Sequence, residues 1–97
     1  MPVYILLMKL TDQGIKNIKD APQRIEAGIG AFEKMGGKLL GFYAVMGEYD
    51  YVAIGEMPND EVATAFLLGL GAGGDVRTTT LKALTKEQFV EIVKRLP

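Results

Sequence analysis

An apolar run at residues 3–10, broken only by Lys9, constrains the fold more than any other segment. It contains Val, Tyr and Ile and does not alternate with polar residues, which is typical of a strand covered on both faces. It is too short to span a bilayer, and no positively charged region precedes it as in a signal peptide. We therefore expect residues 3–10 to form a buried strand.

Capping, turn and periodicity signals predict the elements that follow this strand. Gln23 stands three residues after Asp20, as in a capping box, and the double glycine after Met35 indicates the end of that helix. The predicted elements are a helical turn over 15–19, a helix from Asp20 to Gly36, strands over 38–46 and 51–57, a helix beginning near Asp60, a strand over 76–84 and a final helix capped by Thr85.

This order, β-α-β-β-α-β-α, predicts an α+β fold: a ferredoxin-like βαββαβ antiparallel sheet with an added C-terminal helix. The first and third strands should be central, because they are the apolar ones, and the second and fourth should be edges. With 97 residues there is room for one domain, so we assign 1–97 to a single domain.

The two central strands are apolar at both alternating sets of positions, although the helices of such a fold cover only one face of the sheet. We expect one set to face the helices and the other to be covered by a second copy of the chain, because a large apolar patch is rarely left to water. The set expected to face the helices is Val3, Ile5, Leu7, Val52 and Ile54, and the set expected to face the second copy is Tyr4, Leu6, Met8, Tyr51 and Ala53.

Composition excludes several classes of function. The chain has eleven basic and twelve acidic residues without a basic stripe, which argues against nucleic acid as a partner. It has no Cys and no His, so disulfides, thiol catalysis and histidine metal sites or bases are absent. We expect no cofactor, no metal and no membrane partner, and the lack of cysteine is compatible with a cytoplasmic location.

Gly69, Gly71 and Gly74 spell the dinucleotide-binding pattern G-x-G-x-x-G, but its context is wrong. The pattern requires a strand before the loop and a helix after it, whereas here a helix enters and a strand leaves. We interpret this segment as a flexible connection, with a mobile loop that admits a ligand as the alternative. Gly28 and Gly30 in the preceding helix suggest close approach of that helix to the sheet.

The candidate site residues lie at the turn between the two middle strands and on the fourth strand. Glu48, Tyr49, Asp50 and Tyr51 either form a tight turn with Tyr49 packed over the sheet end, or line the rim of a pocket. The alternating residues Arg77 and Thr79 are either a solvated edge or a site for an anionic group. A third interpretation is structural, an ion pair between Arg77 and Asp50.

Five stretches of the sequence, taken together, resemble the GYD domain family. They are residues 9–15, 18–22, 41–43, 47–52 and 76–80, and the resemblance extends over essentially the whole chain. The Gly-Tyr-Asp of the family name is interrupted here, because Glu48 separates Gly47 from Tyr49. The resemblance implies a small bacterial or archaeal protein of the dimeric α/β-barrel type, in which two sheets pack face to face. It implies no catalytic residues.

Three functions are compatible with the sequence. The first is a homo-oligomeric ligand-binding, sensory or regulatory module that holds a small anionic or aromatic molecule with Tyr49, Asp50, Tyr51 and Arg77. The second is a cofactor-free enzyme, which without histidine would need a Tyr49–Asp50 pair for proton transfer. The third is a structural scaffold. No nucleophile–base pair decides between them, so catalytic residues are unknown.

Overall fold

The computed structural model describes all residues, 1–97, as one sheet with helices. No helix has both the length and the apolar character needed to cross a membrane. In chain order the elements are β1 (Val3–Leu10), α1 (Asp12–Lys16), the short 3₁₀ helix η1 (Ile18–Asp20), α2 (Ala21–Lys34), β2 (Lys38–Ala44), β3 (Tyr51–Glu56), α3 (Asp60–Ala72), β4 (Val76–Ala83) and α4 (Lys86–Lys94).

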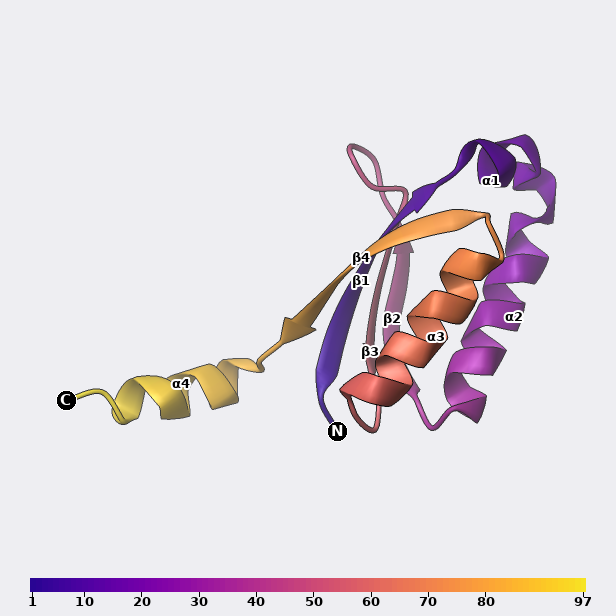
Figure 1. The fold of residues 1–97 in the computed structure, drawn as a ribbon. Coiled ribbons are helices and arrows are strands. Elements are labelled where there is room, and N and C mark those ends of the chain that lie inside the picture. The colour runs from indigo at the N-terminus through magenta and orange to yellow at the C-terminus, as the bar shows by residue number, and fades with distance from the viewer.

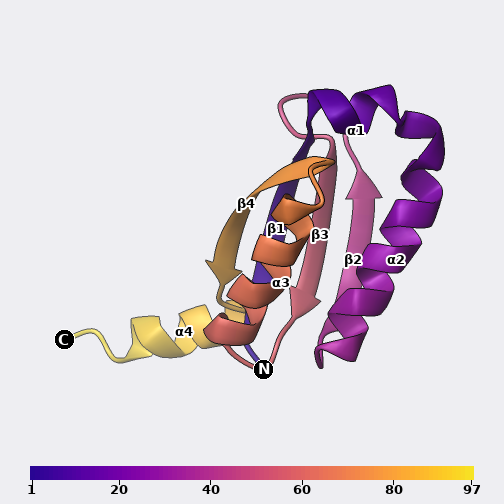
Figure 2. The same ribbon diagram turned by 45° about the vertical axis from the view of Figure 1, so that its right-hand side comes forward.

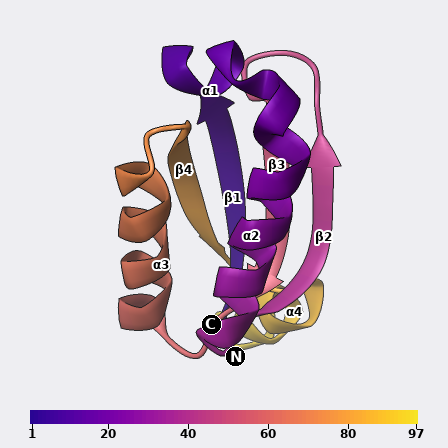
Figure 3. The same ribbon diagram turned by 90° about the vertical axis from the view of Figure 1, so that its right-hand side faces the viewer.

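The four strands form one antiparallel sheet in the order β2-β3-β1-β4, as Figure 2 shows. The apolar strands β1 and β3 are central, and β2 and β4 are the edges. Both α2 and α3 lie on one face of the sheet, in front of it in Figure 3. The predicted ferredoxin-like α+β arrangement is therefore confirmed.

The hydrophobic core lies between this face and the two helices. Tyr4, Leu6 and Met8 of β1 are buried there together with Phe32 of α2. Phe66 of α3 meets Phe32 edge to face, with ring centroids 5.1 Å apart. The core therefore depends on one set of alternating positions in β1, joined by Ala53 of β3.

The predicted assignment of the two faces was wrong. Tyr4, Leu6, Met8 and their neighbours on β3 face the helices, and the set that begins with Val3 faces away. Both sets are apolar, so hydrophobicity alone did not distinguish them. On the helix side, the Tyr4 hydroxyl also donates a hydrogen bond to Asp60 at the first turn of α3.

Two local predictions were also wrong. Asp20 makes no side-chain hydrogen bond that caps α2, because η1 runs directly into that helix. Gly69 and Gly71 do not form a loop but lie within α3, where the Gly73 N–H donates to the Gly69 carbonyl at 3.3 Å. Only the short segment after α3 makes the connection to β4, and Gly74 adopts a positive φ of 85° there.

Helix α4 stands apart from the rest of the fold. Thr85 begins it with the predicted capping box, in which the Thr85 hydroxyl accepts from the Gln88 N–H and the Gln88 side chain accepts from the Thr85 N–H. The helix projects from the end of β4 on the side of the sheet opposite α2 and α3 (Figure 1). All of its residues are exposed.

Gly14 and Gly30 provide a matched test of packing in this fold. A Cβ at Gly14 would lie 2.1 Å from the Asp75 carbonyl oxygen, whereas a Cβ at Gly30 would meet nothing within 4 Å. Gly14→Ala should lower the free energy of unfolding by about 1–3 kcal/mol through overpacking. Gly30→Ala should raise it by about 1 kcal/mol through helix propensity. Urea denaturation of both variants measures these effects, and equal stability of the two would contradict the packing described for Gly14.

Candidate functional site

Asp50 ends the connection between β2 and β3 and extends the sheet by one step. Its N–H donates to the Met8 carbonyl at 2.9 Å, and its carboxylate oxygen Oδ2 accepts from the Leu10 N–H at 2.8 Å. The carboxylate thus satisfies a backbone donor on β1 beyond the last residue paired with β3. Asp50 has a structural role at this position, and the structure contains no ion pair between it and Arg77.

Glu48 and Tyr49 meet Lys9 at the same end of the sheet. The Lys9 ammonium lies 3.6 Å from the Glu48 carboxylate and 5.6 Å from the centre of the Tyr49 ring. Lys9 and Glu48 are both exposed, so the ion pair adds little stability. These contacts fit the interpretation in which Tyr49 packs over the end of the sheet.

The structure does not bring the six predicted site residues together. Tyr51 lies on the helix side of the sheet, 5.4 Å from the Phe42 ring. Arg77 and Thr79 are exposed on the other side, opposite Lys9 and Leu7 of β1. Glu48, Tyr49 and Asp50 are at the tip. Ligand binding at these residues stays a prediction, and a single pocket built from Tyr51 and Arg77 is incompatible with their opposite faces.

The sheet face away from α2 and α3 is apolar along its centre, and we call it the open face. Strand pairing aligns Ile5 between Ile54 of β3 and Leu81 of β4, and Leu7 opposite Val52. None of these residues is buried, although all are apolar. Such a contiguous apolar surface is characteristic of an interface rather than of a solvated face.

Helix α4 carries a second uncovered apolar surface. Phe89, Ile92 and Val93 follow the spacing i, i+3, i+4, which places them on one side of the helix, and Leu96 lies just beyond its C-terminal end. Their exposed fractions are 59%, 43%, 45% and 67%. All residues of α4 are exposed, so this apolar side is uncovered in the single chain.

On the opposite side of the sheet, α2 and α3 border an apolar groove, which sequence reasoning missed. Its volume is about 540 Å³, and 18 of its 24 lining residues are hydrophobic. The floor includes Leu6, Met8 and Ala53 of the central strands, and Figure 3 shows β1 between the two helices. Gly28 of α2 and Gly69 of α3 line the groove, and a Cβ at either would meet nothing within 4 Å.

These glycines do not have the predicted role. Gly28 and Gly30 do not permit close approach of α2 to the sheet, because the space beside each is open. Glycine lowers the stability of a helix interior by about 1 kcal/mol relative to alanine. Helix stability therefore does not explain why glycine occupies these positions. The sequence does show two glycines in each of these helices. That one glycine of each pair borders a groove could be recognised only from the distance between α2 and α3.

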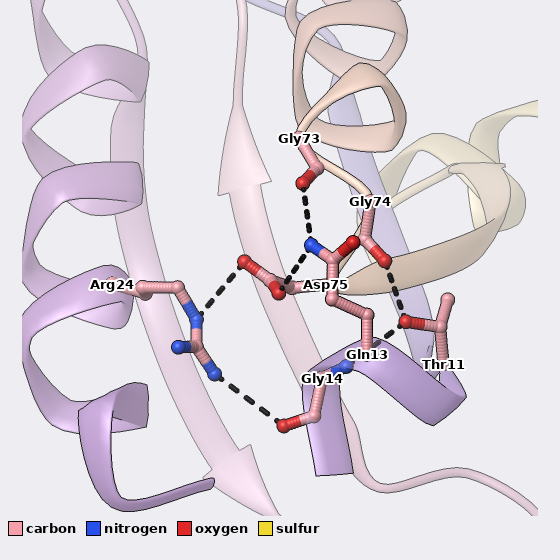
Figure 4. Close-up of polar contacts among 7 residues, drawn as sticks. All are labelled: Thr11, Gln13, Gly14, Arg24, Gly73, Gly74 and Asp75. Atoms are coloured by element: carbon pink, nitrogen blue, oxygen red, sulfur yellow. Dashed lines mark hydrogen bonds and ion pairs between the residues drawn. The ribbon is translucent and has the colours of Figure 1, made fainter. Parts of the chain in front are cut away.

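A polar cluster spans one end of the groove (Figure 4). Arg24 of α2 reaches Asp75 at the start of β4, with Nε 3.0 Å from Oδ2, and donates to the Gly14 carbonyl at 3.5 Å. Gln13 donates to Asp75 at 3.0 Å, and the Thr11 hydroxyl donates to the Gly74 carbonyl at 2.5 Å. The cluster joins α1, α2 and the connection after α3, and it contains the charged side chains of the groove.

Tyr4, Asp60 and Lys82 form a second polar cluster at the N-terminus of α3. The Tyr4 hydroxyl donates to Asp60, and the Lys82 ammonium lies 3.0 Å from the same carboxylate. The hydrogen bond to Asp60 and burial raise the pKa of Tyr4 to about 12. The hydrogen bonds from Tyr4 and Lys82 hold the pKa of Asp60 below its usual value.

Comparison with known proteins adds a family and one relative. The family model for the GYD domain matches residues 4–93. A protein of Thermus thermophilus is 32% identical over 95 residues, which cover 97% of this chain and 100% of that protein. It is named "Glutamine synthetase and cystathionine beta-lyase binding protein". No solved structure matches this chain.

The Tyr4–Asp60 hydrogen bond predicts how Tyr4 titrates. Tyr4 should lose its proton near pH 12, about two units above an ordinary tyrosine. Because the folded pKa exceeds the unfolded value of 10.0, the stabilisation from this group is fully present below about pH 10 and is lost between about pH 10 and 12. Spectrophotometric titration of tyrosinate measures the shift.

Asp60→Asn and Asp20→Asn are matched variants for this titration. Asp60→Asn should lower the pKa of Tyr4 towards its usual value, because it removes the acceptor and its charge. Asp20→Asn should leave the titration unchanged. If no tyrosine of the folded wild type titrates late, the hydrogen bond is not as described.

Proposed function

This chain belongs to the GYD domain family, and we propose that it is a self-associating module that binds metabolic enzymes. The observation that carries the proposal is the pair of uncovered apolar surfaces, the open face and the apolar side of α4. A 97-residue chain that leaves both to water gives up much of its available hydrophobic stabilisation. Binding to other chains restores it.

The open face is suited to a second copy of the same chain. Two such faces related by a twofold axis present identical apolar residues to each other, as an isologous interface requires. Packed sheets lie about 10 Å apart, so the side chains of the two open faces would interdigitate in a shared core. The assembly would be a dimeric α/β barrel, with α2 and α3 of each copy on its outside.

Helix α4 is suited to a different protein. Its apolar side presents anchors at helical spacing, the pattern by which an amphipathic helix is recognised in a hydrophobic groove. The capping box begins the helix independently of tertiary contacts, and the helix stands away from α2 and α3 (Figure 1). We assign this surface to the enzyme partner.

The name of the Thermus thermophilus relative supports a partner of this kind, because it describes binding to glutamine synthetase and cystathionine beta-lyase. The 32% identity over nearly the whole of both chains makes these two enzymes the first to test. A module of this sort acts by altering the activity or assembly of its partner, so the proposal requires no catalytic group in this chain.

Leu81→Glu tests self-association. Leu81 lies on the open face of an edge strand and is 47% exposed, so a charge there is tolerated in the isolated chain but not in a shared apolar core. Native mass spectrometry should show a dimer for the wild type and a predominantly monomeric variant with unchanged circular dichroism. Thr64→Glu on the exposed side of α3 is the control and should remain dimeric. A monomeric wild type at micromolar concentration would contradict the proposal.

Ile92→Glu tests the enzyme interaction. The variant places a charge at the centre of the apolar side of α4, whereas Glu91→Gln changes a neighbouring exposed residue on the polar side. Biolayer interferometry against purified glutamine synthetase and cystathionine beta-lyase should show wild-type binding to at least one. Ile92→Glu should weaken it by at least about tenfold, a loss of about 1.4 kcal/mol, while Glu91→Gln binds normally and both variants stay dimeric. If the wild type binds neither enzyme, the assignment of these enzymes as partners is wrong.

A further inference from the structure

We propose that the groove between α2 and α3 binds a linear aliphatic molecule that carries a terminal carboxylate, with the chain along the groove and the carboxylate at Arg24. The lining residues lie on α2, α3 and the helix side of the sheet, opposite the open face, so the groove takes no part in the surfaces assigned to other proteins. Figure 3 shows α2 and α3 on this side of the sheet. The proposal therefore goes beyond the proposed function and stands independently of it.

The groove opens to solvent and has the size of a small-molecule site. A volume of about 540 Å³ lies within the range of about 300–1,000 Å³ that is typical of small-molecule sites. The lining combines many hydrophobic side chains with a few polar groups, which is also typical of such sites.

Glycines keep the groove open at a cost to the helices. Gly28 and Gly69 face each other's helix across it, and no neighbouring atom would oppose a larger side chain at either position. Each lowers helix stability by about 1 kcal/mol relative to alanine. Alanine or leucine here would stabilise the isolated chain, so the glycines are best explained by an occupant that needs the space.

The shape of the groove favours a chain over a compact ring. The lining residues on α2 extend from Ala21 to Met35, an interval of 14 residues, which at a rise of 1.5 Å corresponds to about 21 Å. The floor between these ends consists mainly of leucine, methionine and phenylalanine side chains together with Ala53, and Tyr51 is the lining residue that carries a hydroxyl. An extended aliphatic chain buries its whole length on such a surface.

Arg24 supplies the polar end. A guanidinium has five N–H donors, and Arg24 uses one for Asp75 and one for the Gly14 carbonyl. Three N–H donors remain, and Arg24 lines the groove with a side chain that is 29% exposed. Arginine recognises carboxylates through pairs of parallel hydrogen bonds, so these donors select a carboxylate over a neutral head group. Asp75 and Gly14 hold the guanidinium in position for this contact (Figure 4).

The test uses dodecanoate, below its micellar concentration, in calorimetric titrations of the full chain. The wild type should bind it saturably with one molecule per chain. Gly28→Leu fills the groove and should weaken binding at least about tenfold. Gly30→Leu is the matched control, because Gly30 is on the same helix with equally open space but does not line the groove. Thermal unfolding should show that both variants fold.

Dodecanol and Arg24→Gln distinguish the head group from the chain. Arg24→Gln should weaken dodecanoate binding at least about tenfold and leave dodecanol binding within about twofold of the wild type. Retained dodecanol binding also shows that the variant still forms the groove. Native mass spectrometry should find the same oligomeric state with and without dodecanoate, which separates this result from the test of self-association.

Four outcomes overturn the proposal. Absence of saturable dodecanoate binding to the wild type excludes the site. Equal binding by Gly28→Leu and the wild type, or an equal loss in Gly30→Leu, places any binding outside the groove. If Arg24→Gln weakens the binding of dodecanoate and dodecanol equally, Arg24 does not recognise the carboxylate.

Discussion

Two central strands that are apolar on both faces, with helices on only one side, determine the rest of this structure. Residues of β1 at alternating positions pack beneath α2 and α3, while Ile5 and Leu7 face away with no part of the chain above them. A strand cannot turn one apolar face inward without presenting the other outward. The sheet therefore has a second apolar face that no helix of the same chain covers.

The polar contacts hold this arrangement at its two ends. At one end Tyr4 anchors the first turn of α3 through Asp60, and at the other Arg24 anchors α2 to the start of β4 through Asp75. Between these anchors Phe32 of α2 and Phe66 of α3 pack edge to face, and both rings line the groove. The two helices therefore touch at this aromatic pair and border the groove along the rest of their facing sides.

Much of the fold could be predicted from the sequence, since element order, strand order and the capping box at Thr85 all follow from local patterns. The orientation of the sheet could not, because both faces of the central strands are apolar and contacts between distant residues, such as the hydrogen bond from Tyr4 to Asp60, are not visible in local patterns. The candidate site was harder still. Tyr51 and Arg77 were both predicted to line one ligand site. Strand alternation and register place them on opposite faces of the sheet. The groove depends on the separation of α2 and α3, which local patterns do not encode.

The short length of α4 affects how it can bind. It has nine residues, and a helix of that length is marginal in water unless its apolar side is covered. A partner that captures α4 must therefore also offset the conformational entropy of ordering it, which lowers affinity relative to the area buried. Release is correspondingly easy, and the contact is suited to regulation, where an interaction must be reversible as well as specific.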